Sequence, residues 1–156
     1  MTRPAGFTLI EILVTVVISG ILFGGGIAAY RGIGDKQAVK QNGATFLSNL
    51  RAFQQKALAS EKPADCGANK LESFKVSYVN VSSYSVKASC VGTATTITLT
   101  DEVEFTAGFN DIDFQVLKAE VLNGGIEEEQ TITLQKGSTS YQVTIEQRGV
   151  ISGKLL

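Results

Sequence analysis

Residues 6–30 read GFTLIEILVTVVISGILFGGGIAAY, an apolar stretch close to the start of a chain of 156 residues. From Phe7 to Tyr30 it holds 24 residues, and Glu11 is the one acidic or basic side chain among them. As an α-helix with a rise of about 1.5 Å per residue, they would extend about 36 Å. The apolar core of a bilayer is roughly 30 Å thick, so the stretch predicts a membrane-spanning helix over residues 7–30.

Two simpler interpretations of this stretch leave Glu11 unexplained. A cleaved secretory signal finds support in residues 26–28, Gly-Ile-Ala, which offer the small residues that a signal peptidase accepts. Such signals, however, have an apolar region of about 7 to 15 residues without acid. A plain membrane anchor, outside any filament, explains the length, but a carboxylate near a helix centre costs about 3 kcal/mol in a membrane. Cations stand on both sides of the stretch, so charge alone does not orient it.

Residues 6–11, with the sequence GFTLIE, resemble the cleavage motif of the type IV pilin superfamily. That motif has a short leader with a basic residue, a glycine, a phenylalanine that becomes N-methylated, and a glutamate at the fifth position of the mature chain. Gly6, Phe7 and Glu11 match it. The resemblance implies that a prepilin peptidase removes residues 1–6 on the cytoplasmic side of the membrane. Phe7 then becomes the methylated N-terminus, and the chain is a single-pass protein of the cytoplasmic (inner) membrane with its head outside the cytoplasm.

Glu11 acquires a physical role if cleavage creates a new N-terminus at Phe7. As the fifth residue of a helix, it lies about 6 Å along the axis from that terminus. In a filament of staggered subunits its carboxylate can pair with the new α-amino group of a neighbour, and in hydrocarbon either charge alone is penalised. The resemblance implies other pilins or pseudopilins, the prepilin peptidase, an inner-membrane assembly platform and, before assembly, membrane lipid as partners.

Gly20, Gly24, Gly25 and Gly26 interrupt the second half of the apolar stretch. Gly20 and Gly24 have the GxxxG spacing that brings membrane helices together, although so short a pattern often arises by chance. An interior glycine weakens a helix by roughly 1 kcal/mol relative to alanine. As the resemblance implies, we expect the last three of these glycines to mark a segment that unwinds when the subunit leaves lipid for the filament. A simple kink is the alternative.

Residues 31–62 change to an amphipathic pattern. Apolar side chains, among them Phe46 and Leu50, recur at helical spacings on one face. This pattern predicts a helix that lays its apolar face on a sheet. It ends at Lys62, because a residue that precedes a proline avoids the helical conformation. Two glycines within residues 31–35 predict a weak point or kink there.

Residues 63–156 show a period of two instead. Short segments alternate apolar and polar residues and are separated by Ser, Gly, Asn or Asp, which indicates antiparallel strands with one buried face. The predicted hairpin turns are Gly124-Gly125 and Gly137-Ser138. The predicted fold class is α+β, a long N-terminal helix, membrane-spanning in its first half, packed on an antiparallel β-sheet head.

The composition argues against an enzyme. The chain has no histidine, which removes the commonest general base and the commonest zinc ligand. It also lacks the GxSxG and SxxK arrangements of serine enzymes. An anchored envelope enzyme would have to rely on carboxylates such as Asp111 and Asp113, which fall on one face of a predicted strand. The acidic residues between positions 101 and 113 invite a calcium site, but their spacing does not fit an EF-hand, and a solvated loop is favoured. We therefore expect no catalytic residues, no cofactor and no metal.

Cys66 and Cys90 are the two cysteines of the chain. They are too far apart for a CxxC redox motif and too few for a zinc site. In an oxidising envelope they would close a loop that stabilises the head by about 3 kcal/mol. A redox-active thiol and a pair of buried free thiols are the alternatives. Nothing basic stands beside either cysteine, which favours the structural disulfide over the redox thiol.

The C-terminal part adds to the resemblance. Residues 103–105, Gly108, the predicted strands at 131–134 and 141–146, and residues 148–150 are similar to a pattern found in two groups of proteins. These are the H-type minor pseudopilins of type II secretion and the FimT-like minor pilins of type IV pili. The resemblance implies a minor pseudopilin of a secretion pseudopilus, with a minor or major pilin of a surface pilus as the alternative.

DNA uptake, a role of FimT-like pilins, is a further alternative. In those proteins it is associated with a basic C-terminal region. Here Lys136, Arg148 and Lys154 are the only cations after Lys118, and the acidic residues 127–129 lie among them. With a formal net charge of -1, the chain shows no broad electrostatic footprint for nucleic acid. The sequence leaves DNA binding open and does not support it.

Overall fold

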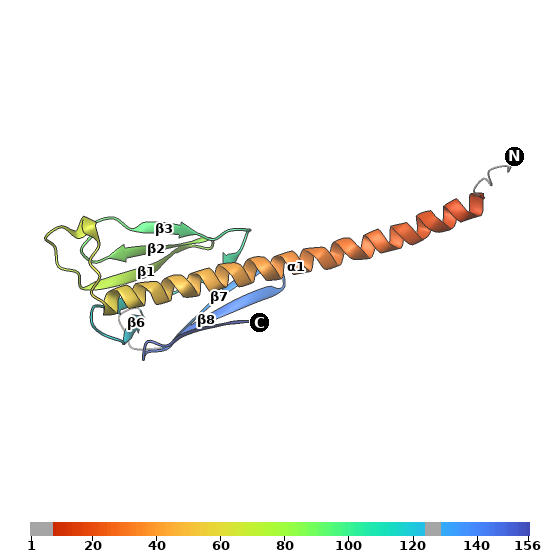
Figure 1. The fold of residues 1–156 in the computed structure, drawn as a ribbon. Helices are drawn as coiled ribbons and strands as arrows, with labels where there is room; N and C mark the ends of the chain where they lie inside the picture. The colour runs from red at the N-terminus through yellow and green to blue at the C-terminus, as the bar shows by residue number, and fades with distance from the viewer. Residues whose placement is uncertain (1–7, 124–128) are drawn as a thin grey trace. The chain divides into compact units, whose positions relative to one another are not determined.

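The computed structural model describes residues 8–123 and 129–156, with the side chains of these residues apart from 24–31 and 122–123. Within that range the chain forms one long helix followed by strands in two antiparallel sheets (Figure 1), so the α+β fold is confirmed. Contacts divide the chain into two compact units, Met1–Gly34 and Asp35–Leu156. The elements are α1 (Leu9–Leu58), the short helix η1 (Ala64–Cys66), β1 (Ser73–Asn80), β2 (Ser83–Ala88), β3 (Thr95–Thr98), β4 (Glu104–Phe105), β5 (Ile112–Gln115), β6 (Val121–Asn123), β7 (Gln130–Lys136), β8 (Thr139–Ile145) and β9 (Ile151–Leu155).

The first unit contains the N-terminal part of α1. Its backbone stays helical through all four glycines of the apolar stretch and through residues 31–35, where the sequence predicts a weak point. The large apolar side chains from Leu9 to Phe23 are exposed. Across the described ranges, no helix is both long and apolar enough to cross a membrane.

The second unit, called the head below, begins with the rest of α1, which ends at Leu58 and not at the predicted Lys62. Ser60 adopts a left-handed φ of 53°. Its N–H donates to Ala57 O at 3.1 Å, and Glu61 N–H donates to Lys56 O at 2.9 Å. These two bonds form a Schellman motif, which satisfies carbonyls that a helix end leaves free. The helix therefore stops by its own capping, before the proline restricts the chain.

The head contains the two sheets. The first has the strand order β3-β2-β1-β5-β6, the second has the order β4-β7-β8-β9, and neighbouring strands are antiparallel. The turn predicted at Gly137-Ser138 joins β7 to β8. Gly137 has a φ of 58° there, which glycine adopts at little cost. The turn predicted at Gly124-Gly125 lies outside the described residues.

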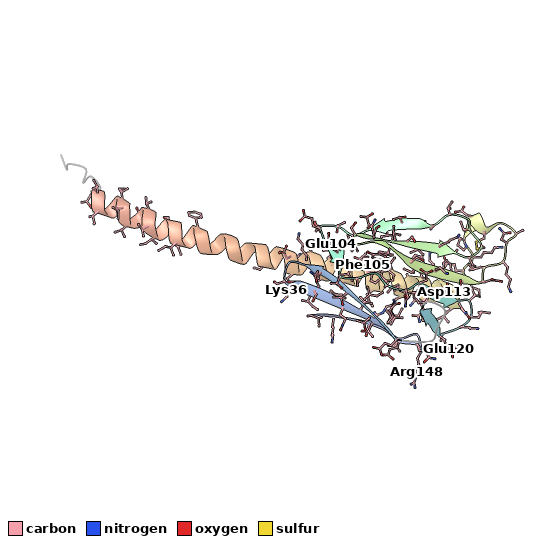
Figure 2. All side chains as sticks on the ribbon, turned by 180° about the vertical axis from the view of Figure 1, so that it is seen from behind. Lys36, Glu104, Phe105, Asp113, Glu120 and Arg148 are labelled. Atoms are coloured by element: carbon pink, nitrogen blue, oxygen red, sulfur yellow. A yellow bond between two sulfur atoms is a disulfide. The ribbon has the colours of Figure 1, made fainter. Side chains whose placement is uncertain are left out.

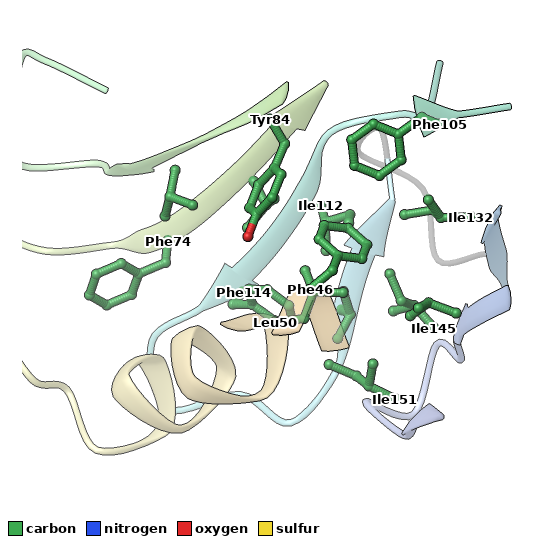
Figure 3. Close-up of a cluster of buried hydrophobic side chains, with 14 of the residues drawn as sticks. Phe46, Leu50, Phe74, Tyr84, Phe105, Ile112, Phe114, Ile132, Ile145 and Ile151 are labelled. Atoms are coloured by element: carbon green, nitrogen blue, oxygen red, sulfur yellow. The ribbon is translucent and has the colours of Figure 1, made fainter. Parts of the chain in front are cut away.

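The core lies between α1 and the inner faces of both sheets (Figure 3). Phe46 and Leu50, each 1% exposed, project into it from α1. The Phe46 ring packs edge-on against Tyr84 of the first sheet, with 4.9 Å between ring centroids, and against Phe105 of the second sheet, with 5.5 Å. Burial of apolar area is the main favourable term in folding, so this helical turn joins both sheets into one core.

Backbone bonds also tie the edges of the two sheets to other parts of the head. Phe105 N–H donates to Val81 O at 2.7 Å and links β4 to the β1–β2 turn. Val121 N–H donates to Gln147 O at 3.1 Å and links β6 to the segment after β8. These bonds occupy backbone groups that an edge strand otherwise leaves unpaired.

Candidate assembly site

The predicted assembly residue Glu11 lies in the first turn of α1. The Thr8 Oγ1 atom accepts a hydrogen bond of 3.3 Å from the Glu11 backbone N–H and so caps the helix. The side chain of Glu11 is exposed, and within residues 8–123 and 129–156 its carboxylate has no hydrogen-bond or ion-pair partner. It is therefore available to a group outside this chain. Sequence reasoning missed the Thr8 cap, although a threonine three residues before a glutamate signals it. Gly6 and Phe7, the predicted cleavage residues, lie outside the described residues.

The helix surface beside this turn is apolar. A groove of about 580 Å³ is lined by Thr8, Leu9, Ile12, Leu13, Val16 and Val17. Their spacing of one and four residues puts them on one face of the helix, where another helix or lipid chains fit. Further along, a Cβ atom built on Gly20 meets nothing within 4 Å. Contacts within the described chain therefore do not require glycine at this position, and the GxxxG interpretation stays a prediction.

Asn42 fixes the loop before β4 to α1. Its buried side chain donates from Nδ2 to Ala38 O at 2.9 Å and to Thr100 O at 3.2 Å. Its Oδ1 accepts from the Thr100 N–H at 3.0 Å and from the Thr100 hydroxyl at 3.3 Å. All four hydrogen-bonding positions of the amide are used. The next two residues, Asp101 and Glu102, have φ values of 57° and 56°, an unusual conformation that this anchored loop maintains.

Tyr141 of β8 packs between two glycines. A Cβ atom on Gly43 of α1 would collide with the Cβ, Cγ and Cδ1 atoms of the Tyr141 side chain. A Cβ atom on Gly153 of β9 would lie 2.6 Å from the Tyr141 hydroxyl and 2.8 Å from its Cε1. The absence of side chains at both positions therefore leaves room for the Tyr141 side chain.

Two further side chains of α1 hold the β8–β9 turn. Arg51 donates to the Ile151 carbonyl from Nε at 3.2 Å and from Nη2 at 2.7 Å. Gln54 Nε2 donates to Gly149 O at 2.6 Å. Gly149 has a φ of 84°, and a Cβ atom there would collide with the Ala119 carbonyl, so the turn needs glycine. In the sequence, Arg51 and Gln54 look like ordinary polar residues of the exposed helix face. No neighbouring residue indicates that they contact this turn.

Cys66 and Cys90 form a disulfide, with 5.1 Å between their Cα atoms. The bond joins η1, which follows α1, to the segment after β2. Both cysteines are buried. The structural disulfide favoured by the sequence is thus present, and the alternative of two free thiols does not hold.

Asp111 and Asp113 are brought together, but a cation lies beside them. Lys75 Nζ is 3.4 Å from Asp111 Oδ2 and 3.5 Å from Asp113 Oδ2, and the Ser73 hydroxyl donates to Asp113 Oδ1 at 3.3 Å. The Asp113 charge, with Asp111 adding to it, raises the pKa of Lys75 despite partial desolvation. Both carboxylates therefore serve as ion-pair partners of Lys75. Among the described residues, no three acidic, cysteine or histidine side chains gather to hold a metal ion.

The cations considered for DNA binding do not form one surface patch of free charge. Lys136 lies 3.5 Å from Asp35 and 3.9 Å from Glu102, in ion pairs at the β7–β8 turn. Arg148 projects outward from the head (Figure 2), and Lys154 is exposed on β9. The structure adds no observation in favour of DNA binding.

Tyr84 makes a pH-dependent contribution to the stability of the head. Burial raises the pKa of its hydroxyl above the ordinary value, and the hydrogen bond of 2.7 Å that Asn49 Nδ2 donates to it partly offsets the rise. Because the folded pKa is the higher one, this group's contribution to stability is present below the unfolded value of about 10 and is lost as the pH rises through the folded pKa.

We expect an alkaline titration of the folded chain, followed by tyrosinate absorbance, to contain a component above about pH 10 that belongs to Tyr84. Tyr84→Phe should remove that late component. A Tyr84→Phe chain whose alkaline titration curve ends at the same pH as that of the wild type would contradict the expectation.

Comparison with known proteins identifies the start of the chain. Residues 1–27 match a family model described as the prokaryotic N-terminal methylation motif. This match supports a type IV pilin-like signal, with Gly6, Phe7 and Glu11 inside it, and it does not extend to the head. No curated protein and no solved structure matches the chain.

Proposed function

We propose that the chain is a structural subunit of a type IV pilin-like filament. A prepilin peptidase cuts after Gly6 and methylates Phe7, residues 7–30 hold the subunit in the cytoplasmic membrane before assembly, and the head lies outside the cytoplasm. The match of residues 1–27 to the methylation motif carries this proposal. The exposed apolar face of α1 that follows is the surface such a subunit would bury in lipid or against neighbouring helices.

Glu11 is the residue through which assembly selects processed subunits. Its carboxylate is unpaired within the described chain, one helical turn after the new terminus. In an apolar surrounding an unpaired carboxylate is penalised, and a neighbour's α-amino group at Phe7 relieves that penalty. The α-amino group at Phe7 exists only after cleavage, so an unprocessed neighbour cannot offer this partner to Glu11.

Within this class, a minor pseudopilin of a secretion pseudopilus is the first choice and a pilin of a surface pilus the second. The C-terminal similarity to H-type pseudopilins and FimT-like pilins supports the choice of a minor subunit. Residues 148–150, which belong to that pattern, form a turn held by Gln54 of α1. In the filament, Gly24, Gly25 and Gly26 permit the helix to unwind as the subunit leaves lipid, and Gly20 and Gly24 permit close helix contact.

Intact mass and N-terminal sequencing of the membrane-extracted chain, co-expressed with a prepilin peptidase, test the processing. We expect a chain that begins at methylated Phe7. A chain that begins near Ala29 would indicate a cleaved secretory signal, and one that begins at Met1 in the presence of active peptidase would indicate a plain anchor.

Glu11→Gln tests the assembly step separately. We expect processing at Gly6 to continue and the fraction of subunit found in sheared filaments to fall at least tenfold, because the neutral amide removes the charge pair. Thr15→Val is a matched control, since the Thr15 hydroxyl bonds only its own helix, at Ile12 O, and this variant should assemble normally. Normal assembly of Glu11→Gln would contradict the proposed pairing.

A further inference from the structure

The two described sheets have four edge strands. In three of them, contacts with other parts of the chain or an exposed cation oppose pairing with a further strand. β4 and β6 are tied through Val81 and Gln147. β9 has its first outward carbonyl occupied by Arg51 and carries the exposed cation Lys154. Covering an edge and placing cations on it are common protections against unwanted strand pairing. β3 has neither.

The backbone of β3 presents free hydrogen-bonding groups on the side away from β2. Leu99 N–H donates to Ser82 O at 2.8 Å, so this residue faces β2. Successive residues of an antiparallel strand face alternate sides, so the N–H and C=O groups of Thr96 and Thr98 point away from the sheet. In the part of the chain that the structure describes, these groups have no partner.

The sequence of this edge favours strand pairing. Residues 91–100 read VGTATTITLT, without a charge or a proline, and β-branched residues dominate. Such residues suit a strand, and their neutrality opposes no incoming strand. An edge of this kind is a template for another extended chain.

A hollow of about 240 Å³ lies beside the edge. Its walls include the apolar side chains of Ile97 on β3, Val86 on β2 and Phe53 on α1. Val86 is buried, and the other two are half-buried. Asp65 is the one charged residue in the lining, and its carboxylate has no partner within the described residues. The hollow therefore offers an apolar site for one side chain and a negative charge beside it.

From these observations we infer that the edge of β3 docks an extended strand of another protein. The strand pairs with the outward backbone groups of Thr96 and Thr98, as in recognition by strand addition. An inward apolar side chain of the strand enters the hollow, and a lysine or arginine next to it faces Asp65.

A second copy of this chain does not fit the edge as well. β3 runs along α1 (Figure 1), so pairing two β3 strands antiparallel would point the two α1 helices in opposite directions. Subunits inserted in one membrane point the same way, and at this step the inference rests on the proposed function. A copy in the same direction would have to present one of its other edge strands, and β4, β6 and β9 are tied or guarded as described above.

A synthetic peptide tests the site on the full chain in detergent micelles. The probe is a capped octapeptide of alternating threonine and valine with one lysine, and binding is followed by the amide NMR signals of the chain. We expect the signals of Thr96 and Thr98 to shift and their hydrogen exchange to slow. Thr98→Pro should weaken binding about tenfold, because it removes one outward donor. Thr98→Val, which keeps the N–H, should bind as the wild type does.

Proline is compatible with this position, since the N–H it removes faces outward and the preceding Ile97 is extended. Unchanged signals from the rest of the head verify that Thr98→Pro folds. Exchanging the peptide's lysine for glutamate should weaken binding, and Asp65→Asn should remove that difference.

Three outcomes would overturn the inference. The peptide fails to shift the two threonine signals at millimolar concentration, it binds Thr98→Pro as tightly as the wild type, or Ile97→Cys forms disulfide-linked dimers without peptide, which assigns the edge to a second copy. N-terminal processing is read by mass in a separate sample, so failure here leaves the proposed function intact.

Discussion

Replacing Gly43 by alanine is expected to lower the free energy of unfolding of the head by about 2 kcal/mol. The added methyl group would collide with the Tyr141 side chain at its Cβ, Cγ and Cδ1 atoms. These atoms lie next to the strand backbone and do not swing away as a flexible side-chain end would. The better helix propensity of alanine offsets roughly 1 kcal/mol and does not reverse the sign. Chemical denaturation of the full chain in detergent, followed by tyrosine fluorescence, measures the change.

Gly34→Ala is the matched control on the same helix, because a Cβ atom there meets nothing within 4 Å. This variant should be neutral or more stable by up to about 1 kcal/mol. In a Tyr141→Ala background, Gly43→Ala should lose most of its effect, since the colliding Cγ and Cδ1 atoms are gone and only Cβ remains. Equal destabilisation by both glycine substitutions would refute the packing of Tyr141 against the helix.

Removing the disulfide is expected to destabilise the head by about 3 kcal/mol. The bond closes a loop with a sequence separation of 24, and closing a loop of that length removes this much conformational entropy from the unfolded chain. The double variant Cys66→Ala/Cys90→Ala, compared with the oxidised wild type by denaturation, gives the value.

Treatment with a reductant distinguishes the effect of losing the disulfide bond from the effect of replacing the cysteine side chains by smaller ones. It should destabilise the wild type by nearly the same amount and leave the double variant unchanged. A wild type whose denaturation midpoint does not respond to reductant under unfolding conditions would show that the bond contributes no stability.

The sequence predicted the fold class because periodicity is a local property. The change from apolar residues at helical spacing to alternation defines α1 and the strands, and Phe46 and Leu50, chosen by spacing alone, are buried in the core. The end of α1 was harder to predict from the sequence, since the helix stops at Ser60, which has a left-handed backbone conformation, and not at the residue before the proline. Serine is not the usual residue at such a cap, so the sequence signal favoured the proline.

The contacts that hold the head were not predictable because their partners are distant in the chain. Asn42 bonds Thr100, 58 positions later, and in isolation it reads as one more polar residue in a helix. Asp111 and Asp113 are close in sequence, but the position of Lys75 depends on the register of β1 and β5. The GFTLIE motif was different, because it is a contiguous signal read by an enzyme and needs no tertiary partner.

The way α1 is attached also determines how the head bears mechanical load. Contacts join the helix to the rest of the head from Asp35 to Gln54, over about 28 Å of helix length. Traction along the helix axis acts on all of them in shear, so they share the force and must yield together. A sideways force would peel them apart one after another. The head is therefore built to resist being drawn along its own helix.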